Sequence, residues 1–291
     1  VDLPADAVLI VQEPRAGTGL DGLGFSHCAY LNCERIGPRT SYAALAPRPR
    51  IKGGSLPSTM SMAFGGVEEP AAMLLGDPRG FDSVDRLERL ADQVVQPARR
   101  HPDARGNRLL DQVSAWLGEI APGIEIRATR FREMDLVRLG MVYRQEGGVP
   151  EEFRPTNVGF GLGYVLHILI AGLSAPDSTL FLVENPEAHL HPRGQSRIGR
   201  FLGRLSRAGL QVVVETHSDH LLNATRLLVR EKALQPDEVA IHYFRRERLG
   251  DQFVHRADSP RIDGDGRIDQ WPQGFFDEWE EALDALLRPM P

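Results

Sequence analysis

The strongest constraint on the fold is an alternation of strand-length apolar runs and helix-length amphipathic stretches between residues 158 and 244. The expected order is helix 158–173, strand 179–184, helix 193–207, strand 210–215, helix 218–230 and strand 239–244. In such βαβ alternation the crossover helices cover the faces of a parallel sheet. The sequence therefore predicts an α/β fold, a parallel sheet with flanking helices.

The remaining segments have weaker patterns. They predict a strand at 7–11, short strands and loops over 13–80 with an exposed segment near 47–57, helices over 84–100 and 105–120, a hairpin of 124–131 with 136–143, and a closing helix over 275–287. The predicted division is a strand- and loop-rich part (1–83), a helical insertion with a hairpin (84–150), the α/β core (151–234) and a small appended α+β domain (235–291).

Composition places the chain among ordinary globular proteins, with 42% hydrophobic and 25% charged residues. A net charge of −6 argues against a surface built throughout for phosphate backbones, but it allows a local basic patch. The sequence lacks both a run of about 20 apolar residues and a secretory signal, so we expect a cytoplasmic protein with no membrane partner. Cys28 and Cys33 are too far apart on an extended segment for a disulfide, so free thiols are expected.

Two neighbouring strands of the predicted sheet end in residues that carry chemistry. The apolar run 180–183 is followed by Glu184, and the next strand leads into His217. Ligands bind at the carboxyl ends of parallel strands, so this rim is the expected site. A carboxylate there suits a Mg²⁺ ion shared with nucleotide phosphates.

At this point the sequence resembles a known family. Residues 180–192 (LFLVENPEAHLHP) and 210–220 (LQVVVETHSDH) resemble the Walker B/D-loop segment and the switch-histidine strand of ABC-class ATPases, in the SMC-like branch of AAA-family proteins. Residues 157–166 resemble the signature helix of that branch, and residues 30–39 resemble another of its blocks. Residues 241–287, with the segment 269–277, resemble the uncharacterised C-terminal domain that follows such cores.

The resemblance implies a role for each matching residue at the rim. Glu184 takes the Walker B position near Mg²⁺, and His217 faces the γ-phosphate of ATP. Asn185 stands where the family at large has its catalytic glutamate, and an amide cannot accept a proton as a carboxylate does. Either Glu187 or another residue is then the hydrolytic base, or turnover is slow.

The resemblance also implies a second set of nucleotide contacts. Asn157 and the first amides of its helix, with Gly159 and Gly161, meet the γ-phosphate held by a partner subunit, and His191 is a further nucleotide contact. A helix N-terminus binds anions through its free N–H groups. The signature serine of typical ABC proteins is absent, and Gly159 lies near its place.

One family feature is missing from the sequence. Phosphate binding in these ATPases requires GxxxxGK[ST], and neither Lys52 nor Lys232 lies in such a motif. Since the chain also opens directly on a strand-like run, we expect a fragment or split protein whose phosphate loop lies elsewhere, inactive alone, rather than a true pseudo-ATPase.

Several other interpretations stay open. The histidines at 189, 191, 217 and 220 are spaced so that they can share a zinc ion. Arginines at 193, 197, 200, 204 and 207 form a stripe that fits either nucleic acid or, as we favour, ion pairs with neighbouring acids. The run 263–269 hints at a calcium loop, but it fits a turn better because the required glycine and closing glutamate are absent.

Together these features predict the C-terminal portion of a dimerising, ATP-binding ABC/SMC-like ATPase. The expected cofactors of the complete protein are ATP and Mg²⁺, and its expected partner is a second copy, with an effector protein or DNA as further candidates. The resemblance suggests a nucleotide-driven switch in DNA transactions or anti-phage defence. The alternative is a scaffold that keeps the fold, does not hydrolyse nucleotide and binds a protein or nucleic acid.

Overall fold

The computed structural model describes residues 7–11, 27–31, 41–43, 91–131, 133, 136–143, 151–249 and 252–288. Five sequence expectations fall wholly or partly outside these residues: the strands and loops over 13–80, the exposed segment near 47–57, the block 30–39, the first part of the helix expected over 84–100, and Cys33.

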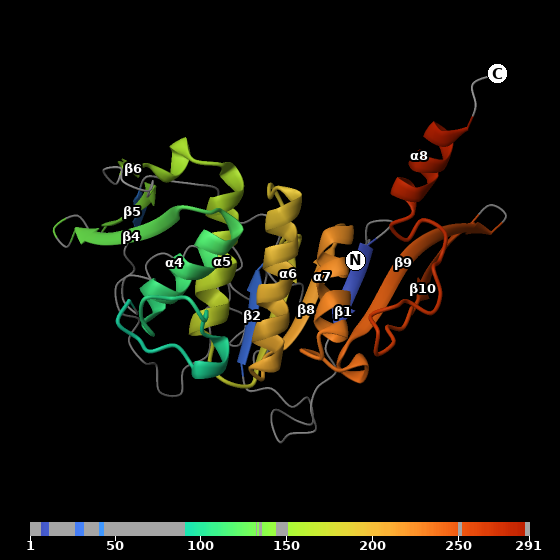
Figure 1. The fold of residues 1–291 in the computed structure, drawn as a ribbon, viewed down its shortest axis with the longest axis horizontal. Helices are drawn as coiled ribbons and strands as arrows, with labels where there is room; N and C mark the ends of the chain where they lie inside the picture. The colour runs from blue at the N-terminus through green and yellow to red at the C-terminus, as the bar shows by residue number, and fades with distance from the viewer. Residues whose placement is uncertain are drawn as a thin grey trace.

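A six-stranded sheet forms the centre of the molecule, in the order β10-β9-β1-β8-β7-β2 (Figure 1). Its strands are β1 (Ala7–Val11), β2 (His27–Leu31), β7 (Thr179–Glu184), β8 (Gln211–Thr216), β9 (Ala240–Leu249) and β10 (Gln252–Asp258). β7 and β8 are parallel, as the βαβ pattern predicts, and β2, which lies outside that pattern, is parallel to β7. The predicted α/β class, with parallel strands and flanking helices, is confirmed.

The sheet is not parallel throughout, because β1 lies between β8 and β9 and is antiparallel to both. β9 was expected within the βαβ alternation and instead joins the sheet through β1. β10, which the sequence analysis did not predict, pairs antiparallel with β9. The division into four segments stays a prediction, although β9 of the fourth segment pairs with β1 of the first.

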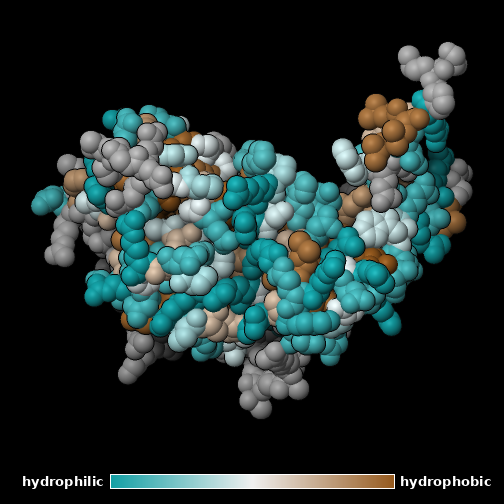
Figure 2. Space-filling view, viewed as in Figure 1, coloured by the Kyte–Doolittle hydropathy of each residue, from teal (hydrophilic) through white to brown (hydrophobic). Residues whose placement is uncertain are grey.

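Two helices cover one face of the six-stranded sheet. α6 (Pro192–Arg207) packs along α7 (Asp219–Arg230), and Figure 1 shows both in front of the strands. The residues that α6 buries recur at helical spacing: Ile198, Phe201, Leu202 and Leu205. Their opposite faces are hydrophilic, as Figure 2 shows over the centre of the molecule. The amphipathic period therefore fixes which side of each helix meets the sheet.

A second sheet lies beside the first, in the order β3-β5-β4 with β6 on β5. Its strands are β3 (Ser41–Ala43), β4 (Ile124–Phe131), β5 (Leu136–Tyr143) and β6 (Glu151–Phe153). The hairpin of β4 and β5 has the bounds that the sequence predicts. α4 (Leu109–Ile120) packs on β4 and on both α5 (Phe160–Ser174) and α6, so it joins the two sheets.

The prediction of a helix over 84–100 is wrong for residues 91–100, the part that the structure describes. Residues 91–100 form turns, an isolated bridge of Val94 with Arg108, and the 3-10 helix η2 (Pro97–Arg99). Val94, expected on the apolar face, is exposed, whereas Val95 is buried. Pro97 explains the failure, because proline lacks an N–H and restricts the residue before it.

The C-terminal segment ends in α8 (Glu278–Leu287), which extends away from the rest of the described fold (Figure 1). It begins three residues later than expected, because Phe275 is buried against Tyr243. α8 leaves large apolar side chains exposed, among them Trp279 and Leu286, and Figure 2 shows this apolar tip. Within the described part of the chain, every helix falls short of the length and apolarity needed to cross a membrane.

Candidate functional site

The rim where β7 and β8 end brings two carboxylates together. Glu184, the last residue of β7, pairs in register with Glu215 on β8. Tyr30 reaches the same point from β2, and its hydroxyl donates to Glu184 Oε1. Three neighbouring parallel strands therefore supply one polar site at their carboxyl ends, where ligands of α/β sheets bind.

The loop after each strand is tied to the other. The backbone N–H of Asn185 donates to the carbonyl of Glu215 at 3.0 Å, and Asn185 adopts a positive φ of 43°. Oε1 of Glu187 accepts from the backbone N–H of His217 at 2.7 Å. Oε2 of Glu187 is buried and has no hydrogen-bond partner among the described residues. Glu187 thus holds the loop that carries His217.

His217 completes the cluster. Its side chain is 43% exposed, and Nε2 lies 3.7 Å from Glu215 Oε1. Glu215 therefore lies in contact range of His217 and in register with Glu184, and the predicted convergence of Glu184 with His217 stays a prediction.

The pKa of the Glu215 carboxyl lies above its usual range. Burial raises its pKa, and the charge of Glu184 raises it further, whereas His217 opposes the rise. Desolvation and a like charge both penalise the ionised carboxylate. A cation placed between Glu184 and Glu215 would relieve both penalties.

The two helices that follow the strands begin at defined caps. The ring of His191 accepts from Arg193 N at 3.5 Å at the start of α6, and Ser218 Oγ accepts from Leu221 N at 3.2 Å at the start of α7. Ser218 Oγ also donates to Gln195 Oε1 at 2.6 Å, which joins the two helix starts. Capping accounts for the sharp turns between each strand and its helix.

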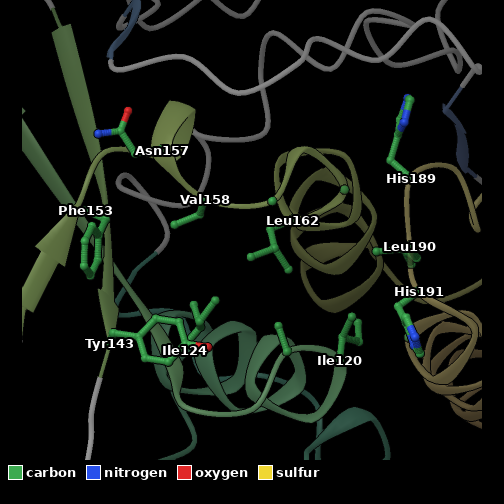
Figure 3. Close-up of a pocket in the computed structure, with 14 residues that line it drawn as sticks. Ile120, Ile124, Tyr143, Phe153, Asn157, Val158, Leu162, His189, Leu190 and His191 are labelled. Carbon is green, nitrogen blue, oxygen red and sulfur yellow. The ribbon is translucent and has the colours of Figure 1, made fainter.

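A pocket of about 420 Å³ brings together Asn157, Gly159, Gly161 and His191, the four residues assigned to nucleotide contacts. Figure 3 shows Tyr143 and Phe153 on one side and His189, Leu190 and His191 on the other. Glu184, Glu187 and His217 do not line it. Asn157 ends the 3-10 helix η4 (Pro155–Asn157) rather than lying in α5, whose N-cap is Gly159.

Gly161 lets α5 approach the loop between β7 and α6. A Cβ on this residue would overlap the carbonyl oxygen of His189 and stand 2.8 Å from its carbonyl carbon. The ring of Tyr164, one turn along α5, meets the ring of His189 edge-on at 5.1 Å. The glycine therefore couples the start of α5 to the loop that follows Glu184.

A shared zinc site is not supported. Across the residues that the structure describes, no group of three or more histidine, cysteine, aspartate or glutamate side chains is arranged to hold a metal ion. His191 caps α6, and His189 packs on Tyr164.

The arginine stripe of α6 is largely engaged by neighbours, as the favoured interpretation expects. Arg197 pairs with Glu119 at 2.9 Å, and Arg200 makes two hydrogen bonds to Glu231 at 2.7 and 2.8 Å. The Arg204 guanidinium lies 5.9 Å from the ring centroid of Trp116, and burial lowers its pKa.

Two residues of the rim were missed by sequence reasoning. Glu215 sits at the end of its strand as Glu184 does, so the parallel register was the signal that could have found it. Tyr30 had no such signal, because its contact joins residues 154 positions apart.

Known proteins match the chain in three ways. The family described as "AAA domain, putative AbiEii toxin, Type IV TA system" matches residues 76–223, and a family of proteins of unknown function, DUF3696, matches residues 234–286. The energy-coupling factor transporter ATP-binding protein EcfA1 of Methanospirillum hungatei is 25% identical over 199 residues, 67% of this chain. The match spans 66% of that relative, just under two thirds of its length.

Solved structures of SMC proteins are also similar. A structure from work on ATP-driven dimerization and DNA-stimulated activation of SMC ATPases aligns at 12% identity and a TM-score of 0.38, over 63% of this chain and 93% of that one. The Smc head domain of Pyrococcus yayanosii aligns at 14% identity and a TM-score of 0.35, over 52% of this chain and 26% of that one. At these TM-scores the likeness supports no statement about function.

Proposed function

Because the chain belongs to the family described as "AAA domain, putative AbiEii toxin, Type IV TA system", we propose that it is the catalytic-rim portion of an ABC/SMC-like ATPase. In this proposal ATP binds between two copies of the complete protein, and closure of the pair drives a partner. The phosphate-binding loop comes from outside these residues, since the sequence contains no GxxxxGK[ST].

The observation that carries the proposal is the convergence of Glu184, Glu215 and His217 where parallel strands end. The donor set fits Mg²⁺, which takes one or two carboxylates and completes its shell with waters and phosphates. A Mg²⁺ ion bound in this way needs fewer than three ligands from the protein. We assign Glu184 to hold the ion, with Glu215 beside it, and the bound ion would neutralise the charge of the β- and γ-phosphates.

The loop residues receive distinct roles. Glu187 positions His217 through its hydrogen bond to the backbone N–H. It is also the proposed base, because the amide of Asn185 cannot accept a proton as a carboxylate does. His217, with an exposed ring, is assigned to the γ-phosphate. Asn185 orients water or phosphate without accepting a proton.

The pocket at the start of α5 is assigned to the nucleotide of the partner subunit. Gly159 is the N-cap of α5 and has no side chain to cap the helix. The N–H of Leu162 donates to the carbonyl of Gly159 at 3.0 Å, so in this proposal an anion meets the N–H groups that precede Leu162. Asn157, Gly161 and His191 border the same space. ATP bound to one copy would therefore meet this pocket on the other.

The second candidate function is a scaffold that does not hydrolyse nucleotide. The lack of a phosphate loop in the sequence and the amide at position 185 favour it. In either case the setting that we propose is a DNA transaction or anti-phage defence, with an effector protein or DNA as the further partner. Arg197 and Arg200 of the α6 stripe are already paired with glutamates, which argues against the stripe as the surface that binds this partner.

Calorimetric titration with ATP and Mg²⁺ separates the two candidates. We expect negligible binding by this chain alone, and binding in the micromolar range once the chain is joined to the loop. Tight binding by the chain alone would overturn the assignment of the loop to another segment. A joined protein that does not bind ATP would favour the scaffold.

A further inference from the structure

A basic pocket of about 520 Å³ lies between α7 and the turn at 263–267, apart from the rim described above. It is lined by Asn223, Arg226, Leu227, Arg230, Asp265, Gly266 and Arg267. The lining therefore carries three arginines against one aspartate. An excess of arginine in a concave site is the usual provision for phosphate.

The wall formed by the turn is rigidly built. Oδ1 of Asp263 accepts from the backbone N–H groups of Asp265 and Arg267 at 2.9 and 2.8 Å, and these bonds hold the pKa of Asp263 below its usual range. Gly266 takes a φ of 77°, and a Cβ there would lie 2.5 Å from the carbonyl oxygen of Arg226. The turn thus packs directly on α7.

The three arginines differ in what holds them. Arg226 donates through Nε to the carbonyl of Gly266 at 2.8 Å and through Nη1 to Asn223 Oδ1 at 2.8 Å. Arg230 and Arg267 make no side-chain ion pair or hydrogen bond with the described residues, in contrast to Arg197 and Arg200 of the α6 stripe. Arg226 is therefore part of the wall, and the other two guanidinium groups are available to a ligand.

An aromatic surface stands next to these charges. The guanidinium of Arg226 lies 5.7 Å from the ring centroid of Trp271, and the indole is 43% exposed. The indole and the ring of Phe275 meet edge to face, with their centroids 5.1 Å apart. A flat, oriented ring beside cationic groups is the arrangement on which nucleic-acid bases stack.

We propose that this pocket binds the phosphate of a nucleotide whose base stacks on Trp271. The space exceeds what a lone phosphate needs and lies in the range of small-ligand sites. The nucleotide is either free or one unit of a single-stranded nucleic acid, since both present the same phosphate and base. The pocket contains none of the residues assigned to ATP hydrolysis, so this proposal stands independently of them.

The test measures binding of a fluorescently labelled oligothymidylate to the chain by anisotropy, in EDTA and at 50 to 200 mM salt. We expect Arg230→Ala with Arg267→Ala to weaken binding about 100-fold, at about tenfold for each charged contact. Because the two guanidinium groups bind one phosphate, the slope of log K against log salt should become shallower by about 0.7, the value for one phosphate of a single strand. Arg207→Ala, which removes an exposed arginine of α6, is the matched control and should change neither quantity.

Trp271→Ala removes the stacking surface without changing the charge. It should weaken binding roughly 5- to 100-fold and leave the slope of log K against log salt unchanged. Competition by thymidine monophosphate would identify a free nucleotide as the ligand, and failure to compete would identify the single strand. Both variants should keep the circular dichroism of the unaltered chain; if the double alanine variant does not, Arg230→Gln with Arg267→Gln replaces it. Absence of binding to both probes at 50 mM salt, or equal loss in Arg207→Ala, would overturn the proposal.

Discussion

At the scale of single residues, charge on this chain is used in two ways. On α6, arginines are neutralised by carboxylates from neighbouring elements, as in the pair of Arg200 with Glu231. At the rim, Glu184 and Glu215 stand together, and burial with like charge raises the pKa of Glu215. Paired charges contribute to folding, whereas the like charges of the rim oppose it, and in our proposal a bound Mg²⁺ ion offsets them.

The pair on α6 gives a pH prediction. The hydrogen bond from Arg200 lowers the pKa of Glu231, so its contribution is present above the ordinary pKa and is lost as the pH falls through the lowered value. Glu231→Gln should reduce the free energy of unfolding by about 0.5 kcal/mol at pH 7, a value typical of solvent-screened pairs.

Urea unfolding at pH 7 and pH 2.5 measures this difference, which should disappear at the lower pH. Asp237→Asn, at an exposed aspartate of the 3-10 helix η5 (Pro236–Glu238), is the control. An effect of Glu231→Gln that grows as the pH falls would contradict the assignment.

At the scale of elements, two glycines at the start of α5 have different functions. Gly161 lies under the carbonyl of His189, whereas a Cβ on Gly159 would meet no atom within 4 Å. Backbone cannot swing aside as a flexible side chain does, so an added methyl at Gly161 must separate α5 from the loop.

Gly161→Ala should therefore cost about 1 to 3 kcal/mol of stability, and Gly159→Ala should lie within about 0.5 kcal/mol of the unaltered chain. Thermal unfolding of the two variants side by side measures the difference. Equal melting temperatures would mean that α5 and the loop are not in close contact.

Elements with a strong local period were predicted from the sequence, and those fixed by distant contacts were not. The hairpin of β4 and β5, and the helices α5 to α7, lie close to their expected bounds. The isolated bridge of Val94 depends on Arg108, and buried Arg99 reaches the carbonyl of Ala175 and Asp177. No local pattern encodes such partners.

The same distinction applies to the candidate site. The positions of Glu184, Glu215 and His217 at strand ends followed from apolar runs. That Glu215 and Tyr30 lie beside Glu184 depends on the register of the sheet. The direction of β1 was likewise beyond the pattern, since an apolar run predicts a strand and not its orientation.

At the scale of the whole molecule, stability is expected to be uneven. The sheet continues through β1 to β9, whereas α8 exposes Trp279, Leu286 and most of its length. A helix of ten residues without tertiary packing is marginal in water.

Hydrogen exchange followed by mass spectrometry should therefore show that the backbone amides of α8 exchange within seconds. The amides of α7 should exchange about 100-fold more slowly. The two helices are of similar length, so α7 is an internal reference. Equal protection would show that α8 is packed against something in solution.

The role of the rim in hydrolysis is measured by the rate of ATP turnover in a protein that joins this chain to its phosphate-binding loop. With Glu184→Gln, the account predicts a fall in kcat of about 100-fold or more, while Arg207→Ala leaves kcat unchanged. Hydrolysis by Glu184→Gln within twofold of the unaltered protein would contradict it.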